Sequence, residues 1–260
     1  MGNNGRRVGI GVLLRVLVRA FLLQASWSFE RMQSLGFAWA LAPALRRLYP
    51  DDAAFDERLR YHAEYFNTQP YLASFIIGAV VRQEESRAAG NTTGDDIQAL
   101  KESLMGPLGA LGDSFFWGSL KPLAAVIAAA MIIVGWLWGP LLYLLLYNVW
   151  HLSLRTGLLF WGYASSGDAV ALITGFNFTT WARLFKAVSL AVAGAIVGMM
   201  PLWSAEFRLE VPASAQGIAL LGAASTILML VLMRRGGSPI HLMLGLAAFC
   251  LALAYLGVIG

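Results

Sequence analysis

Long segments without any charged residue, all in the C-terminal half, constrain the fold of this chain more than any other feature. No charge occurs between Lys121 and Arg155, and residues 187–205, 211–233 and 236–260 are equally free of charge. Each segment exceeds the roughly 18 apolar residues that suggest a membrane-spanning helix. The sequence therefore predicts an all-α integral membrane protein with several transmembrane helices, about five in all.

Charge is concentrated in the N-terminal half. Of the 19 basic and 15 acidic residues, all but nine lie in residues 1–122, which leaves residues 123–260 as the predicted transmembrane domain. The first charge-free run is interrupted at Gly135 and again at Gly139 and Pro140. It forms either one long kinked helix or two shorter helices.

Basic residues predict which side of the membrane each short loop occupies, since positively charged loops tend to stay in the cytoplasm. The basic residues between positions 155 and 186 precede one predicted span, and Arg234 with Arg235 follows the next. The intervening segment, 204–214, has two glutamates against one arginine. This pattern predicts a multi-pass protein with the arginine pair inside and the C-terminus outside.

Residues 1–43 predict amphipathic helices at the membrane interface. Arg15 and Arg19 recur among apolar residues at helical spacing, and they interrupt the apolar stretch that a cleavable signal peptide would need. In the aromatic-rich segment that follows, Glu30 and Arg31 are expected to be covered by protein, and Pro43 is expected to end the segment.

Residues 44–66 predict a separate cytoplasmic amphipathic helix. The charges from 46 to 64 alternate in sign, as they do on solvated helices, and Asp51 or Asp52 stands near the expected N-cap.

Three neutral hydrogen-bonding side chains come next: Asn67, Thr68 and Gln69, directly before Pro70. Side-chain amides suit sugar hydroxyls because each amide offers both a donor and an acceptor. Asn67 and Thr68 also suit the N-cap of the following helix. The spacing alone leaves both interpretations open.

One carboxylate, Asp113, lies within an otherwise uncharged segment, 104–120, that is rich in glycine and proline. A carboxylate at membrane depth is costly unless it faces protein, water or a ligand, and broken backbone is tolerated there only where it lines a cavity. Residues 67–122 are therefore predicted to hold a transport site built from re-entrant hairpins around 70–82 and 104–120.

Two structural roles compete with substrate contact for Asp113. It could cap a short helix that begins at Ser114, or pair with Lys121 to hold a hairpin closed. Asp113 and Trp117 stand at i and i+4, so they would share one helical face. That pairing favours a sugar, because a carboxylate can bind adjacent hydroxyls while an indole covers the apolar face of the ring.

Neither a metal site nor a cofactor is predicted. Cys250 is the single cysteine, and the three histidines at 62, 151 and 241 lack any ligand spacing. The net charge of +4 comes from basic residues at helix ends rather than from an aromatic-interleaved patch. Nucleic-acid binding therefore has no support.

Three segments carry a family resemblance: LLQASWSFERMQSLGFAWALAPALRRLYP, RYHAEYFNTQPYLASFIIG, and SLMGPLGALGDSFFWGSLKP followed by GPLLYLLLYNVWHLSLR. They resemble the IID membrane subunit of the mannose, fructose and sorbose family of the bacterial sugar phosphotransferase system. The resemblance runs in register from about Arg15 to Gly162 and fades to hydropathy beyond.

The resemblance implies a subunit of an elevator-type transporter in the bacterial inner membrane. A IID subunit assembles with a IIC subunit, the heterodimers associate into trimers, and a hexose or hexosamine binds between the two subunits. Phosphate comes from cytoplasmic IIB and IIA proteins, so this chain is expected to have no catalytic nucleophile. The alternative is a transport-inactive relic with a regulatory or scaffolding role, and a third possibility is an unrelated transporter or membrane enzyme.

Site residues follow from the same resemblance. It implies that four side chains lie near the sugar: Asn67, Gln69, Asp113 and Trp117. Three more match the pattern and would serve internal pairing or docking of IIC: Gln24, Glu30 and His62. Three glycines would let the backbone bend and approach closely in the hairpin: Gly106, Gly109 and Gly112.

Overall fold

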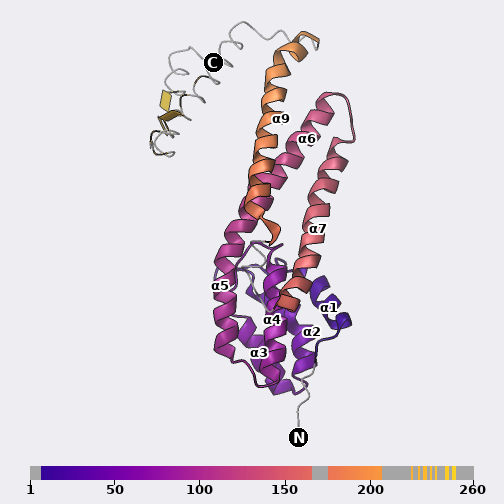
Figure 1. The fold of residues 1–260 in the computed structure, drawn as a ribbon, viewed down its shortest axis with the longest axis vertical. Helices are drawn as coiled ribbons and strands as arrows, with labels where there is room; N and C mark the ends of the chain where they lie inside the picture. Colours follow the sequence, from indigo (N-terminus) through magenta and orange to yellow (C-terminus); the bar gives the residue numbers. More distant parts are fainter. Residues whose placement is uncertain are drawn as a thin grey trace. The chain divides into compact units, whose positions relative to one another are not determined.

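The computed structural model describes residues 7–165 and 175–206, together with isolated positions between 224 and 249. Within these residues every regular element is helical, as predicted, and β-type pairing is confined to isolated bridges of Met32 with Ser28 and Phe66. Residues Met1–Ala195 form one compact unit and Ile196–Gly260 a second, and residues 196–206 of the second belong to helix α9. Figure 1 shows the elements in chain order: α1 (Ile10–Ala20), α2 (Ser34–Leu48), α3 (Asp52–His62), α4 (Ala73–Ala88), α5 (Gly94–Gly112), the π-helix η1 (Asp113–Leu120), α6 (Lys121–Ile133), α7 (Gly139–Ser165) and α9 (Phe178–Glu206).

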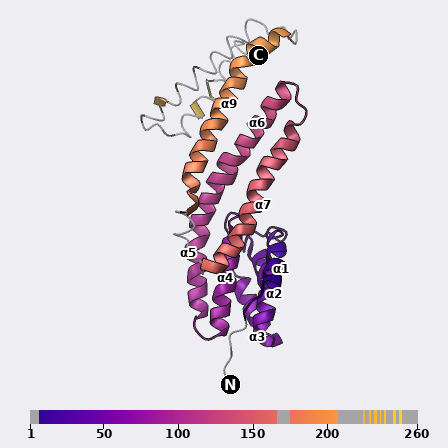
Figure 2. The same ribbon diagram turned by 45° about the vertical axis from the view of Figure 1, so that its right-hand side comes forward.

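The charge-free run after Lys121 forms two helices rather than one. α6 ends at Ile133 and α7 begins at Gly139, and the two helices run side by side (Figures 1 and 2). Gly135 lies in the turn with φ of +87°, a left-handed conformation that glycine adopts without steric cost. Of the other runs, 187–205 lies within α9, whereas 211–233 and 236–260 fall almost wholly outside the described residues. The predicted placement of the C-terminus outside the membrane also concerns residues that are not described.

The reversal expected around residues 104–120 is wrong, because these residues belong to one continuous helix. α5 passes into η1 and then into α6, which makes a helix of 40 residues from Gly94 to Ile133. A proline deletes one backbone hydrogen bond of a helix, and α5 accommodates Pro107 without a break. Within the described ranges, this is the one helix that is long and apolar enough to cross a membrane.

The helical hairpin of this region lies instead between α4 and α5. Gly90, with φ of +82°, turns the chain after α4, and Thr93 and Asp96 start α5 with a reciprocal capping box. The second hairpin, expected around 70–82, is likewise wrong, since α4 runs unbroken from Ala73.

Among the helices that the structure describes in full, α4 has the largest share of buried residues, and it crosses α7 at very short range. A Cβ atom added to Gly78 would lie 2.0 Å from the carbonyl oxygen of Leu159, and one added to Gly162 would lie 2.1 Å from that of Phe75. Both glycines are therefore required for the two backbones to touch, and the contact fixes α4 against α7.

The N-terminal helices differ from the sequence-based expectation in two respects. Pro43 lies inside α2 and does not end it. Glu30 and Arg31 are exposed, because residues 21–33 form turns rather than a packed helix. α1 is amphipathic as predicted. Its buried residues (Leu13, Val16, Leu17 and Ala20) lie on one side of the helix, and α1 packs against α2.

α3 begins as predicted, with the side chain of Asp51 accepting a hydrogen bond from the Ala54 N–H at 2.9 Å. It is not solvated all round, however. Arg58 and His62 are buried against α4, because each finds a partner there.

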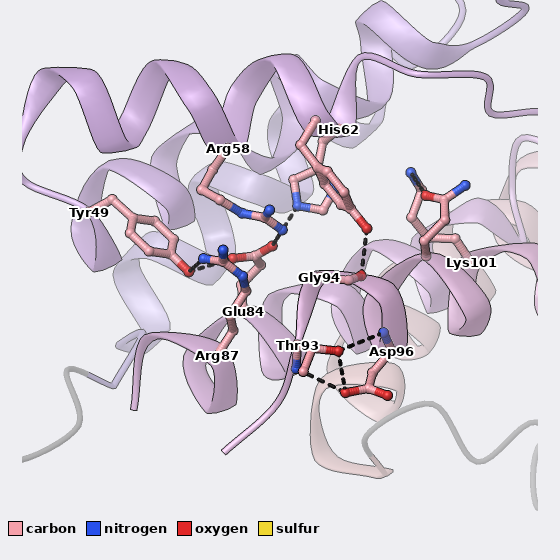
Figure 3. Close-up of polar contacts among 11 residues, drawn as sticks. Tyr49, Arg58, His62, Glu84, Arg87, Thr93, Gly94, Asp96 and Lys101 are labelled. Atoms are coloured by element: carbon pink, nitrogen blue, oxygen red, sulfur yellow. Dashed lines mark hydrogen bonds and ion pairs between the residues drawn. The ribbon is translucent and has the colours of Figure 1, made fainter. Parts of the chain in front are cut away.

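That partner is Glu84, the centre of a group that we call the Glu84 cluster: Tyr49, Arg58, His62, Glu84 and Arg87 (Figure 3). Arg58, His62 and Glu84 are buried, and Tyr49 and Arg87 are half-buried. Arg58 and His62 both donate to Oε1 of Glu84, His62 at 2.8 Å, and the Tyr49 hydroxyl donates to Oε2 at 2.7 Å. Burial alone would raise the pKa of Glu84, but the hydrogen bonds and charge of His62 and Arg58 outweigh it and lower the pKa to about 2. The cluster fastens α2, α3 and α4 together.

Candidate functional site

A cavity of about 390 Å³ opens beside α5, at the end of α4 opposite Glu84. We call it the α5 cavity. Three stretches of chain form its walls: the turn after α1, the segment before α4, and the face of α5 and η1. Its lining residues are Gln24, Trp27, Gln33, Asn67, Thr68, Gln69, Met105, Gly106, Gly109, Ala110, Asp113 and Trp117.

The segment before α4 is held by the side chain of Gln33, whose amide forms two hydrogen bonds with the backbone of Thr68. Gln33 is buried, its Nε2 donates to the carbonyl of Thr68 at 2.8 Å, and its Oε1 accepts the Thr68 N–H at 3.3 Å. The hydroxyl of Thr68 in turn donates to the carbonyl of Met105 on α5 at 3.0 Å. Thr68 is thus fixed to two walls at once, while the neighbouring Asn67 side chain stays exposed.

Gln69 fixes the turn before α4, whereas α4 itself has no side-chain cap, so the capping role that the sequence offered to Asn67 or Thr68 is not filled. Its Oε1 accepts the N–H groups of Tyr71 at 2.8 Å and Leu72 at 3.1 Å. Its Nε2 is buried and has no hydrogen-bond partner. A buried donor without a partner is costly, so the wall of the cavity holds an amide with unused hydrogen-bonding capacity.

Asp113 also lines the cavity, and its carboxylate is exposed. It forms no ion pair with Lys121, and its side chain caps no helix, since it stands inside the continuous helix at the junction of α5 and η1. Within the described residues its carboxylate has neither a hydrogen bond nor an ion pair, so both structural alternatives for Asp113 are removed. Trp117 lies four residues further along the same wall and is half-exposed, at 48%.

The three predicted glycines lie in the continuous helix and not in a hairpin. Gly106 and Gly109 line the cavity, and Gly112 packs against Gln69. A Cβ atom at Gly112 would lie 2.6 Å from both Cβ and Cγ of Gln69, so only glycine lets the amide pack there. At Gly109 the nearest atom is Thr68 Oγ1, at 3.8 Å, and at Gly106 nothing lies within 4 Å. Gly112 alone is therefore required by the packing.

A family model described as the IID component of the mannose/fructose/sorbose family of the phosphotransferase system matches residues 11–259. The chain belongs to this family. The resemblance read from the sequence is thereby confirmed.

Among relatives, the mannose-specific EIID component of Escherichia coli K12 is 40% identical over 184 residues, which cover 70% of this chain and 65% of the relative. The fructose permease IID component of Bacillus subtilis is 33% identical over 188 residues, or 71% of this chain and 68% of the relative. The match thus spans about two thirds of the length of these curated relatives.

Among solved structures, the chain is similar to one in the cryo-EM structure of the mannose transporter ManYZ with microcin E492. The TM-score is 0.60 at 30% identity, and the alignment covers 98% of this chain and 99% of that chain. The similarity therefore extends beyond the region in which sequence motifs are recognisable.

Seven of the ten residues predicted for this IID component come together at the α5 cavity, with contributions from segments as distant as 24 and 117. Three others do not line it. Glu30 lies exposed on the turn, His62 belongs to the Glu84 cluster, and Gly112 stands behind Gln69. Whether the residues at the cavity bind sugar stays a prediction.

Other cavity residues were not predicted, chiefly Gln33, Trp27 and Met105. Trp27 stands in the motif-rich first segment, which is a usable signal. Gln33 acts by pairing with the backbone of Thr68, 35 residues away, and nothing in its local sequence marks that partner. Within the described residues, no group of three or more His, Cys, Asp or Glu could hold a metal ion.

Proposed function

We propose that this IID component is the translocation subunit of a phosphoenolpyruvate-dependent phosphotransferase system and that it carries a hexose or hexosamine of the mannose class. One observation supports this above all: Gln69, whose amide nitrogen has no hydrogen-bond partner, and Asp113, whose carboxylate has none within the described residues, line the same cavity.

The chemistry of the cavity suits a polyhydroxylated, uncharged ligand. Gln69 offers a buried donor, and Asn67 offers both a donor and an acceptor. The carboxylate of Asp113 can accept from two adjacent hydroxyls, while the indole of Trp117 covers an apolar ring face. The cavity volume of about 390 Å³ falls within the range of about 300–1,000 Å³ for small-molecule pockets.

We further propose that the chain works with a IIC subunit, as trimers of IIC–IID heterodimers that move by an elevator mechanism. The similarity to a chain of the ManYZ mannose transporter supports a membrane partner. Phosphate would come from IIB and IIA, and no catalytic nucleophile of this chain takes part. The complex would lie in the bacterial inner membrane, with the C-terminus of this chain outside.

The experiment is phosphoenolpyruvate-dependent uptake of labelled mannose, glucosamine and fructose in cells that contain the cognate IIC and IIAB, with and without this chain. Uptake that requires the chain supports the proposal and names the sugar. A complex that assembles but gives no chain-dependent uptake of any of the three would favour the transport-inactive relic.

Two substitutions test the site itself. Asp113→Asn and Asn67→Ala are expected to lower uptake by about tenfold or more, since each removes a hydrogen bond to the sugar, one of them to a charged group. Asp95→Asn is the matched control, because Asp95 is an exposed carboxylate at the far end of the same helix. Normal uptake in both cavity variants would reject the site.

A further inference from the structure

A second cavity, of about 320 Å³, lies where α1, α2 and α3 meet, and its lining is strongly basic. We call it the arginine cavity, after three of its six lining residues: Arg15, Arg19, Ala42, Pro43, Arg46 and Phe55. It shares no residue with the α5 cavity.

Pro43 explains why one of these arginines is fixed in place. Proline has no N–H, so the carbonyl four residues earlier in α2, that of Trp39, loses its helical partner. Nη1 of Arg19 donates to that carbonyl at 3.1 Å, and the guanidinium lies over the Trp39 ring at 4.7 Å. Arg19 is thereby held at the seam between α1 and α2, which are aligned antiparallel at this contact.

The arginine cavity has more positive charges than nearby carboxylates that pair with them. Arg46 pairs with Asp52 at 2.7 Å and stacks over the Phe55 ring at 4.1 Å. Arg15 is exposed, and within the described residues it has neither a hydrogen bond nor an ion pair. Of the three guanidinium groups that line the cavity, only that of Arg46 is paired with a carboxylate, so the lining can take an anion.

An exposed apolar stripe adjoins the cavity. On α1, Ile10, Leu14 and Val18 follow one another at intervals of four residues, and they are 63%, 48% and 66% exposed. Leu35 and Trp39 on α2 are exposed to a similar extent. In both views α1 and α2 lie at the periphery of the first unit (Figures 1 and 2). Such a stripe is unfavourable in water but favourable beside acyl chains.

We propose that the arginine cavity binds the phosphate of an anionic phospholipid whose acyl chains lie along this stripe. Arginine suits phosphate because its planar fork donates two hydrogen bonds at once. A free phosphate would match the cavity but would leave the stripe exposed. A zwitterionic phospholipid would cover the stripe but would bring its own cation beside the three arginines. An anionic phospholipid satisfies both features. This inference rests on membership of a membrane-protein family and not on sugar transport.

The test is native mass spectrometry of the purified full chain in detergent, titrated with phosphatidylglycerol or with phosphatidylcholine. We expect phosphatidylglycerol to stay bound and Arg15→Gln to weaken its binding by about tenfold, the effect of one charge-assisted hydrogen bond. Arg47→Gln is the matched control, since Arg47 is exposed next to Arg46 but does not line the cavity. Because Arg15 has no protein partner to lose, its substitution should leave the melting temperature without added lipid unchanged.

Three outcomes would overturn the proposal. Equal retention of phosphatidylglycerol and phosphatidylcholine would indicate a nonspecific lipid annulus. Equal losses in the Arg15 and Arg47 variants would indicate diffuse charge attraction rather than a site. Displacement of the lipid by inorganic phosphate at the same concentration would indicate a site for free phosphate.

Discussion

The two ends of the α4–α5 hairpin use similar polar residues in opposite ways. At one end, Glu84 is buried and its cluster is closed: the Glu84 carboxylate accepts from Arg58, His62 and Tyr49. At the other end, the Asp113 carboxylate is exposed and unpaired within the described residues, and it faces a cavity rather than a partner. The two carboxylates therefore differ in what they have left to bind, not in their chemistry.

This difference separates residues that hold the fold from residues that are free to act. A carboxylate that is surrounded by donors has no capacity for a ligand, and its loss leaves buried charges behind. A carboxylate that faces a cavity contributes little to stability and remains available. The comparison predicts that substitutions at the closed end change folding, whereas those at the open end change transport.

The largest expected effect on stability is at the closed end. Glu84→Ala removes the shared partner of Arg58 and His62 and should destabilise the protein by about 3–5 kcal/mol, since both remain buried. Denaturation of the purified chain in detergent measures this. Asp52→Ala is the control, because its pair with Arg46 is exposed and should contribute less than about 1 kcal/mol. Similar losses in the two variants would break the comparison.

Acid should weaken the closed end in a defined direction. The pKa of Glu84 falls from 4.5 to about 2 on folding, so its contribution is present above pH 4.5 and is lost as the pH falls toward 2. Burial lowers the pKa of His62 from 6.5, so acid favours the unfolded state there as well, beginning near pH 6.5. The Glu84 part amounts to about 3 kcal/mol.

Melting temperatures between pH 7 and pH 3 check this prediction. Glu84→Gln cannot titrate at that position, so its stability should depend less on pH over the lower part of the range. An acid dependence as steep as in the unsubstituted protein would assign the effect to other groups.

A smaller effect distinguishes two glycines at the open end. Gly112→Ala would press its Cβ against Gln69 and should cost about 1–3 kcal/mol, together with sugar uptake, because the amide must move. Gly106→Ala meets nothing within 4 Å and should instead stabilise α5 by about 1 kcal/mol. Thermal unfolding of both variants gives the two signs, and a common sign would refute the packing argument.

The sequence was sufficient to predict the helical class, the Asp51 cap and the segments that line the α5 cavity. These depend on local signals, namely hydropathy, capping residues and uncharged polar motifs. The family resemblance added the expectation that Asn67 and Gln69 lie near Asp113 and Trp117, which no local pattern contains, and all four residues line the cavity.

Other features depended on packing and were missed. Glycine and proline around 104–120 suggested a reversal, yet the helix continues because α5, η1 and α6 pack along their neighbours and one lost hydrogen bond is a small cost beside that. The predicted helix end at Pro43 was wrong for the same reason: α2 is held by its packing and tolerates the loss of one backbone hydrogen bond. Gln33 could not be identified, since its role exists only once Thr68 has been brought beside it.

Pro43 also makes a backbone hydrogen bond of α2 depend on a side chain of α1. A residue with an N–H at position 43 would return a helical donor to the Trp39 carbonyl, so the donor from Arg19 would no longer be needed to replace it. The stacking of Arg19 on the Trp39 ring would remain. A backbone donor that is missing from one helix is thus supplied by a side chain of another.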